Sequence, residues 1–272
     1  MTDRYAVIGN PVAHSLSPAI HQAFARQTEQ RLRYDTIEAP LDGFIESVAD
    51  FFAMGGAGCN VTVPFKEEAA RFANILTERA ELAGAVNTLW LDDEGVCGDN
   101  TDGVGLVRDL ARHISLRGRR VVLLGAGGAA RGVIAPLLGE GPASLVIANR
   151  SPDKAAQLAE HFRELGPVSA TAFDKLSEAA DLVINATSAS LAGASLPLPA
   201  ALWTDRTVAY DMMYGKGDTP FLAQARAGGA VPCIDGLGML VEQAAEAFFL
   251  WRGVRPETAS VLADLRALLA QG

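Results

Sequence analysis

The chain has 272 residues, of which 49% are hydrophobic and 20% are charged. This length and composition suit a globular α/β protein of one large or two ordinary domains, and they exclude disordered, collagen-like and coiled-coil chains. The formal net charge is -9, and the one basic cluster, residues 117–120, is short. Nucleic acid is therefore not an expected partner, because proteins that bind it usually present an extended basic face.

The cysteines and apolar segments indicate the compartment. Cys59, Cys97 and Cys233 lie far apart and form no C-x-x-C pair, so we expect neither a disulfide framework nor a thiolate metal site. The apolar stretch 5–9 is too short for a signal peptide, and glycines and an arginine interrupt the segment 121–138. We therefore expect a cytoplasmic protein with no membrane partner. The four histidines show no metal-ligand spacing, so no metal is expected.

Short apolar runs alternate with segments of helical spacing along most of the chain, and this alternation predicts an α/β fold. In the N-terminal half, Ser17 as N-cap and Pro18 as the first helical residue predict a helix start. Residues 92–95 predict a hairpin turn. The strands predicted in this half are 6–9, 32–37, 58–63 and 85–91.

A basic, glycine-containing stretch at 116–120 precedes a run of branched residues, and a second domain is predicted to begin near it. The predicted strands that follow are 121–125, 145–148, 168–172, 182–185, 208–210 and 231–234. The last thirty-odd residues have helical apolar faces, from Leu240 to Trp251 and from Val261 to Leu268. No strand follows them, so these helices must pack on a structure built earlier in the chain.

The sharpest local signal is a G-x-G-x-x-A loop between a predicted buried strand and a helix-like run at 131–138. Glycines allow a tight turn and a close approach of backbone N–H groups to a pyrophosphate at a helix N-terminus. This strand, loop and helix context predicts dinucleotide binding over a purely structural turn. The loop is Gly125-Ala126-Gly127-Gly128-Ala129-Ala130.

The end of the next predicted strand indicates which dinucleotide binds. An NAD site usually has an acidic residue there for the ribose 2′-hydroxyl, but this strand ends in Asn149-Arg150-Ser151, with Lys154 one helical turn later. A guanidinium and an ammonium suit a 2′-phosphate, so the sequence predicts NADP. The alternative is that both are ordinary surface charges, and their register with the glycine loop favours the cofactor.

Polar residues in the N-terminal half, with Gln243 in the last region of the chain, suggest a second site. Ser15 and Ser17 lie in a strand-to-helix turn, where they either bind an anion or serve only as turn and N-cap residues. Lys66 follows a predicted strand through a proline turn and does not lie on an amphipathic face, although a lone lysine is normally a solvated surface residue. Asp102 lies at a predicted helix start, where capping is the simple explanation. Gln243 lies on a packing face and needs hydrogen-bond partners, which either a ligand or a neighbouring backbone group can supply.

In combination and in order, these segments resemble the shikimate dehydrogenase family along nearly the whole chain. The segments that carry the resemblance are His14-Ser15-Leu16-Ser17-Pro18, Asn60-Val61-Thr62-Val63-Pro64-Phe65-Lys66, Gly84-Ala85-Val86-Asn87-Thr88, Asn100-Thr101-Asp102-Gly103, the glycine loop, Asn149-Arg150, and Tyr210-Asp211-Met212 through Asp235-Gly236-Leu237-Gly238. The resemblance implies an N-terminal α/β substrate domain, residues 1–101, closed by C-terminal helices 237–272. It also implies a Rossmann-like NADP-binding domain, residues 102–236.

The resemblance further implies reversible, NADP-dependent reduction of 3-dehydroshikimate to shikimate in aromatic biosynthesis, by a monomer or homodimer. Lys66 and Asp102 would form the catalytic pair. The residues implied for the substrate are Ser15, Ser17 and Tyr214 at its carboxylate, and Thr62, Lys66, Asn87, Asp102 and Gln243 around the ring. The residues implied for the cofactor are Gly125, Ala126, Gly127, Gly128, Ala129, Asn149, Arg150, Ser151 and Lys154, with Met212 and Gly236 at the nicotinamide end.

Two departures from the family pattern concern the cofactor. Ser151 stands where threonine is common, and Lys154 stands where arginine is common. Lysine binds a phosphate without a planar fork, which predicts a looser preference for NADP. The alternative functions are a quinate/shikimate dehydrogenase that accepts NAD, and a non-catalytic regulatory protein that responds to NADP or shikimate. The acid missing after the second strand argues against the first, and the intact lysine and aspartate argue against the second.

Overall fold

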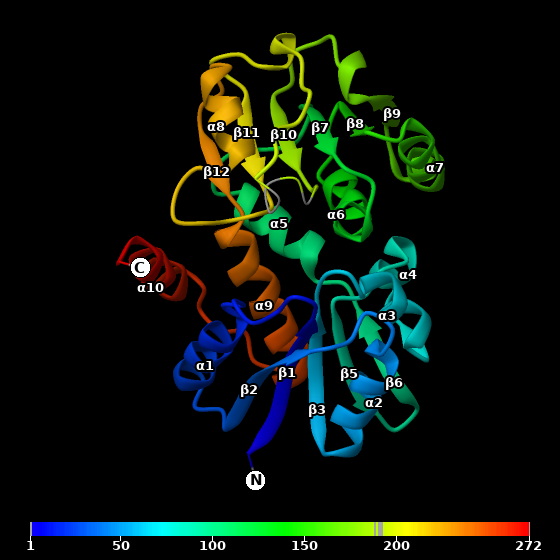
Figure 1. Ribbon diagram of the computed structural model, residues 1–272, viewed down its shortest axis with the longest axis vertical. Helices are drawn as coiled ribbons and strands as arrows, with labels where there is room; N and C mark the ends of the chain where they lie inside the picture. Colours follow the sequence, from blue (N-terminus) through cyan, green and yellow to red (C-terminus); the bar gives the residue numbers. More distant parts are fainter. Residues whose placement is uncertain (1, 188, 190–192, 272) are drawn as a thin grey trace. The chain divides into compact units, whose positions relative to one another are not determined.

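The computed structural model describes residues 2–187, 189 and 193–271. The chain forms two compact units, Met1–Gly105 with Leu240–Leu265, and Leu106–Met239 with Arg266–Gly272. Each unit contains one six-stranded sheet (Figure 1). Within the described ranges, no helix has the length and apolar character needed to cross a bilayer.

The sheet of the first unit has the strand order β2-β1-β3-β5-β6-β4. Its strands are β1 (Asp3–Gly9), β2 (Leu32–Glu38), β3 (Gly56–Val61), β4 (Ile75–Leu76), β5 (Thr88–Asp92) and β6 (Gly95–Asp99). Strand β1 pairs in parallel with β2 and β3, whereas β5 is antiparallel to β3 and β6. The parallel strands β1 and β3 therefore end at the same edge of the sheet, where the chain continues into loops that carry predicted site residues.

Helices cover both faces of this sheet. They are α1 (Ser17–Gln27), α2 (Phe44–Ala53), α3 (Lys66–Phe72), α4 (Glu78–Ala83) and much of α9 (Leu237–Arg252). Alternate residues of a strand point to opposite faces: Ala6 and Ile8 of β1 join a buried cluster with side chains of α2 and α3. On the other face, Tyr5 stacks on Trp251 of α9 with ring centroids 4.7 Å apart. Helix α9 thus packs on the N-terminal sheet, in agreement with the expectation that it packs on a structure built earlier in the chain.

The sheet of the second unit is entirely parallel, with the order β12-β11-β10-β7-β8-β9. Its strands are β7 (Arg120–Leu124), β8 (Ser144–Asn149), β9 (Val168–Ala172), β10 (Leu182–Asn185), β11 (Val208–Asp211) and β12 (Cys233–Asp235). Numbered along the chain, this is the 3-2-1-4-5-6 order of doubly wound dinucleotide-binding folds, with the order reversing between β7 and β10. The predicted α/β class with a Rossmann-like unit is confirmed.

The helices assigned with this second sheet are α6 (Gly128–Gly139), α7 (Pro152–Phe162) and α8 (Pro220–Ala227), while α5 (Asp102–Leu110) and α10 (Ala259–Gln271) run across the limits of the two units. Helix α6 begins three residues before the predicted start, within the glycine loop itself. Its first residue is Gly128, and Gly127 is its N-cap. The amino end of this helix is therefore built from glycine backbone.

The predicted capping role of Ser17 is wrong. Helix α1 begins at Ser17, its N-cap is Leu16, and no side chain caps it directly. The hydroxyl of Ser15 instead accepts a hydrogen bond from the Ser17 backbone N–H, with N and Oγ 3.2 Å apart. The reason is local, because the earlier serine satisfies this backbone donor.

Most predicted strands have limits that differ from the observed ones, and three of these differences are described here. The strand predicted at 58–63 runs from Gly56 to Val61, since the chain turns at Thr62, whose carbonyl accepts from Phe65 N at 3.0 Å. The strand predicted at 85–91 begins only at Thr88. The strand predicted at 231–234 lies at Cys233–Asp235, just after a proline that has no N–H to donate.

Candidate functional site

Lys66 and Asp102, both in the first unit, form an ion pair at the starts of two helices. Lys66 is the first residue of α3 and Asp102 is the first residue of α5. Lys66 Nζ lies 2.6 Å from Asp102 Oδ2, and the two side chains are only 15% and 6% exposed. A short, largely buried pair of this kind holds a cation in a fixed place, which is what a charge-stabilising or proton-transferring lysine requires.

Backbone hydrogen bonds bring the segments of this pair together. The Lys66 carbonyl accepts from Val86 N at 2.8 Å, and Asn87 N donates to the Asp99 carbonyl at 3.0 Å. The side chain of Asn100 accepts from Asp102 N at 3.1 Å and so fixes the start of α5. Backbone hydrogen bonds therefore join the segments that follow β3, precede β5 and follow β6. This connection does not depend on the ion pair between the Lys66 and Asp102 side chains.

Asn87 is the centre of a buried side-chain network. Its Nδ2 lies 2.9 Å from both Asp102 Oδ1 and Thr101 Oγ1, and 3.3 Å from Gln243 Oε1. The Gln243 amide in turn donates to the Leu240 carbonyl at 2.8 Å. The partners of Gln243, left open by the sequence, thus include both a backbone group and side chains. Asn87, Asp102 and Gln243 are all predicted site residues, and the structure brings them together with Lys66.

The loops that follow β1 and β3 lie side by side. Thr62 N donates to the Ile8 carbonyl at 2.9 Å, and Asn10 N donates to the Val63 carbonyl at 3.0 Å. At Gly9, any Cβ would lie 2.3 Å from Thr62 Cγ2, so glycine is required for this approach. The loop after β1 carries Ser15, which is half-buried, and leads into α1, whose first residue, Ser17, is buried. Tyr214 belongs to the second unit, where it follows β11 and is half-buried.

A buried polar chain that the sequence analysis missed lies beneath these loops. The hydroxyl of Tyr34 donates to Asn60 Oδ1 at 2.7 Å, and Asn60 Nδ2 donates to the Asn87 carbonyl at 3.1 Å. Burial raises the pKa of Tyr34 well above its ordinary value, although a hydrogen bond with Ser17 opposes this. In the sequence, this chain is indicated only by Asn60, a polar residue near the end of an otherwise apolar strand.

The glycine loop begins where β7 ends, at the point where the strand order reverses. Gly125 has φ of +112°, which favours glycine, and a Cβ there would lie 3.2 Å from the Ala186 carbonyl oxygen. Gly127 has φ of -93°, and a Cβ there would meet no atom within 4 Å. Protein packing therefore explains the first glycine but not the second. A ligand that approaches the backbone at the amino end of α6 explains Gly127, so the loop fits a dinucleotide.

The predicted phosphate-binding residues follow β8. The Asn149 amide donates to the Ser151 carbonyl at 3.1 Å, which closes the turn into α7. Ser151 is the N-cap of that helix but makes no side-chain cap. Arg150 and Lys154 are exposed to solvent. Two exposed cations one turn apart at the carboxyl end of β8 fit the 2′-phosphate of NADP.

Met212 and Gly236, predicted at the nicotinamide end, are in close contact. Gly236 N donates to the Met213 carbonyl at 3.0 Å, and a Cβ at Gly236 would lie 2.2 Å from the Met212 carbonyl oxygen. The glycine is thus required by packing. The buried residues Asn185 and Asp211, at the ends of β10 and β11, were missed; the Asn185 amide donates to Asp211 Oδ1 at 3.0 Å. Both residues could have been recognised from the sequence, because each is a polar residue at the end of an apolar strand.

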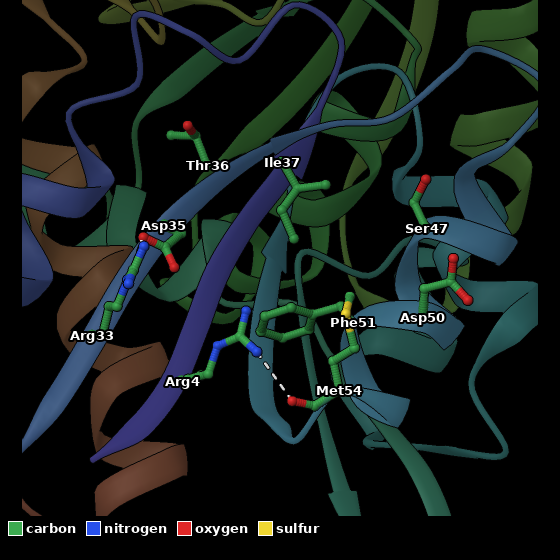
Figure 2. Close-up of a pocket in the computed structure, with 9 residues that line it drawn as sticks. All are labelled: Arg4, Arg33, Asp35, Thr36, Ile37, Ser47, Asp50, Phe51 and Met54. Atoms are coloured by element: carbon green, nitrogen blue, oxygen red, sulfur yellow. Dashed lines mark hydrogen bonds and ion pairs between the residues drawn. The ribbon is translucent and has the colours of Figure 1, made fainter.

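A surface pocket of about 560 Å³ lies elsewhere in the first unit, and none of the predicted site residues lines it. Figure 2 shows the Arg4 guanidinium beside Phe51, donating to the Met54 carbonyl. Arg33 Nε lies 2.9 Å from Asp35 Oδ1. The cations in this pocket already have partners. In the part of the chain that the structure describes, no three His, Cys, Asp or Glu side chains gather where they could hold a metal ion.

Three protein-family models match successive parts of the chain, and together they cover more than half of it. The model described as "Shikimate dehydrogenase substrate binding domain" matches residues 7–89. The model described as "Shikimate / quinate 5-dehydrogenase" matches residues 109–193. The model described as "Shikimate 5'-dehydrogenase C-terminal domain" matches residues 236–266.

Individual proteins are similar over nearly the full length. A shikimate dehydrogenase (NADP(+)) of Dechloromonas aromatica is 63% identical over 272 residues, covering 99% of each chain. The crystal structure of an Ael1 enzyme from Pseudomonas putida is 48% identical, with a TM-score of 0.90 and coverage of 97% of this chain and 98% of that one. The crystal structure of a shikimate 5-dehydrogenase from Thermus thermophilus in complex with NADP(H) and shikimate is 35% identical, with a TM-score of 0.87 and coverage of 98% and 100%.

Proposed function

Because this chain belongs to the shikimate dehydrogenase family, we propose that it catalyses the reversible, NADP-dependent reduction of 3-dehydroshikimate to shikimate. It is an oxidoreductase of the shikimate pathway. The observation that carries the proposal is the buried pair of Lys66 and Asp102, 2.6 Å apart, inside the network of Asn87 and Gln243. In this network the Lys66 ammonium is held in a fixed position among side chains that can hydrogen-bond to hydroxyl groups.

Lys66 stabilises the negative charge that develops on the substrate carbonyl oxygen and donates a proton to it; in the reverse direction it recovers that proton. Asp102 holds the ammonium in place and aims it through Oδ2. Asn87 holds the other carboxylate oxygen, Oδ1, and so limits rotation of the carboxylate. The nicotinamide cofactor supplies the hydride chemistry when it is bound.

The substrate is proposed to bind through groups with different chemistry at its two ends. Ser15 and Ser17 offer hydroxyl donors to the carboxylate, and Tyr214 is assigned to the same group. The hydroxyls of the ring are assigned to Thr62, Lys66, Asn87, Asp102 and Gln243. Asn87, Asp102 and Gln243 are buried, and a ring of hydroxyl groups suits such side chains because each hydroxyl both donates and accepts.

NADP is proposed to bind along the carboxyl end of the second sheet. The backbone of the glycine loop, Gly125 to Ala129, would hold the pyrophosphate at the amino end of α6. Arg150 and Lys154, with Asn149 and Ser151 in the same turn, would hold the adenosine 2′-phosphate. Met212 and Gly236 are assigned to the nicotinamide end.

Three further properties belong to this proposal. The substrate domain is assigned to residues 1–101 with 237–272, and the NADP domain to residues 102–236. The active protein is proposed to be a monomer or a homodimer, which light scattering would determine. A cytoplasmic location is proposed because the substrates are small diffusible metabolites and because the free cysteines suit a reducing compartment.

The experiment is a spectrophotometric assay of NADP reduction, run in parallel with shikimate and quinate and repeated with NAD and with a chelator. We expect NADP reduction with shikimate that the chelator leaves unchanged. Equal rates with quinate or with NAD would instead identify a quinate/shikimate dehydrogenase of relaxed cofactor use. Binding of NADP and shikimate without turnover would identify a regulatory protein.

A further inference from the structure

The guanidinium of Arg79, on α4, contacts two carboxylates from different elements. Its Nε lies 2.7 Å from Asp99 Oδ1 and its Nη2 lies 2.5 Å from Asp99 Oδ2. Its Nη1 lies 3.1 Å from Glu246 Oε1. The side chains of Asp99 and Glu246 are 1% and 10% exposed. Buried carboxylates need charged partners, and a single planar fork supplies both of them here.

One end of this bridge leads to Asp102. Asp99 ends β6, and its Oδ1 also accepts from the Asn100 backbone N–H at 2.7 Å. The Asn100 side chain then accepts from Asp102 N at 3.1 Å. The carboxylate held by Arg79 therefore fixes the short turn that presents Asp102 to Lys66.

The other end of the bridge leads to Gln243. Glu246 lies on α9 three residues after Gln243, so the two side chains leave neighbouring positions on the same side of the helix. Gln243 Oε1 lies 3.3 Å from Asn87 Nδ2. Glu246 has a second cation, Arg255, which bonds its other oxygen, Oε2. Arg79 alone of these two cations reaches both Glu246 and Asp99.

We propose that Arg79 is a positioning residue, whose guanidinium sets the spacing between the turn that carries Asp102 and the helix that carries Gln243. It acts through Asp99 and Glu246 and is not assigned to the substrate itself. Lysine cannot replace it, because a single ammonium lacks the planar fork that serves two carboxylates at once. The inference rests on the proposed function, since it concerns the geometry of that substrate site.

The test compares Arg79→Lys, Glu246→Gln and the double variant with the unchanged full-length protein, using shikimate and NADP as substrates. Lysine keeps a charge beside Asp99, so Arg79→Lys should fold with a Tm near that of the unchanged protein. In both single variants we expect KM for shikimate to rise roughly tenfold, the effect of losing about one charge-assisted hydrogen bond. KM for NADP should stay the same. In the double variant, KM for shikimate should rise no further than in the single variants, because both changes remove the same contact between Arg79 and Glu246.

Arg255→Met is the matched control: it removes the other cation of Glu246 and leaves the bridge intact, so KM for shikimate should stay unchanged. An equal rise in this control would overturn the proposal, as would a lowered Tm with unchanged KM in both bridge variants. If Arg79→Lys does not fold, Glu246→Gln decides by itself, and an unchanged KM for shikimate refutes the bridge. Failure of the unchanged protein to oxidise shikimate would overturn the proposed function instead, which keeps the two failures distinct.

Discussion

Asp102 holds Lys66 through one carboxylate oxygen only: Oδ2 lies 2.6 Å from Nζ, whereas Oδ1 accepts from Asn87 at 2.9 Å. Each oxygen thus has its own partner, and the position of the ammonium is set by a carboxylate that is itself held. The arrangement predicts that the lysine contributes more to the transition state than to substrate binding.

Lys66→Met is therefore expected to lower kcat by about 10²- to 10⁴-fold, the usual range for a general acid or base. Methionine keeps most of the side-chain length and its apolar stem but carries no charge or proton. Shikimate affinity should change far less, because other groups hold the carboxylate and hydroxyls. Steady-state rates and calorimetric titration of the folded variant measure the two effects.

Lys175→Met, at an exposed position of the second unit, is the control and should behave like the unchanged protein. An unchanged kcat with a large rise in KM would make Lys66 a binding residue. The acid–base role would then pass to Asp102.

The two glycines of the loop are expected to respond in opposite ways. Gly127→Val should still fold, because φ of -93° is open to any residue and a Cβ there meets no atom within 4 Å. It should weaken NADP binding by roughly 10- to 100-fold, since the branched side chain would keep the pyrophosphate from the backbone N–H groups. Thermal unfolding and NADP titration are the measurements.

Gly125→Ala is the matched comparison, and it should destabilise the fold by more than about 1 kcal/mol, because φ of +112° strains any other residue. If Gly127→Val bound NADP normally, the cofactor would have to approach a different part of the loop.

Arg150→Ala is expected to weaken NADP binding by roughly 10- to 100-fold, the loss of about 1.5–3 kcal/mol for a charge-assisted contact. NAD, which lacks the 2′-phosphate, should bind as before. Affinities for both dinucleotides, measured by fluorescence titration, test this. Arg206→Ala removes the same charge in the turn before β11, at the opposite end of the parallel strands, and should change neither affinity. Equal weakening for NADP and NAD would mean that Arg150 supports the fold or the shared part of the nucleotide.

The burial of His21 is expected to make the free energy of unfolding depend on pH. It is fully buried, its ring stacks on Tyr34 with centroids 4.2 Å apart, and burial lowers its pKa from 6.5 to about 3. Between these two values the unfolded chain binds a proton that the folded chain does not, so stability is full above pH 6.5 and is lost as the pH falls toward 3. At pH 5 this loss amounts to about 2 kcal/mol.

His21→Phe keeps an aromatic ring against Tyr34 and removes the titration, so its unfolding free energy should fall less between pH 7 and pH 5, by about 2 kcal/mol. Denaturant unfolding at the two pH values measures the difference, and His14→Phe, at an exposed position, is the control. The same pH dependence in His21→Phe and in the unchanged protein would show that another group causes the loss.

Much of the fold follows from local patterns. The strand β10 has its predicted limits, 182–185, because a short apolar run between turn residues has few alternatives. The limits at 85–91 were wrong because residues 85–87 look like strand but bond to the chain at Lys66 and Asp99, which periodicity along the chain does not reveal. Similarly, serine is a residue type typical of N-caps, but Ser17 is the first residue of the helix, and its backbone N–H donates to the Ser15 hydroxyl.

The sequence by itself determined the α/β class, the glycine loop between β7 and α6, and the chemistry of each motif, because these depend on residues that are close along the chain. Only the tertiary structure decided that Gln243 bonds to Asn87, that Asn60 joins Tyr34 to the same network, and that Arg79 bridges Asp99 and Glu246. Arg79 and Glu246 are 167 residues apart. No sequence pattern around a single arginine indicates so distant a partner. The carboxylates of Asp99 and Glu246 become neighbours of Arg79 only when the sheet and the C-terminal helix pack together.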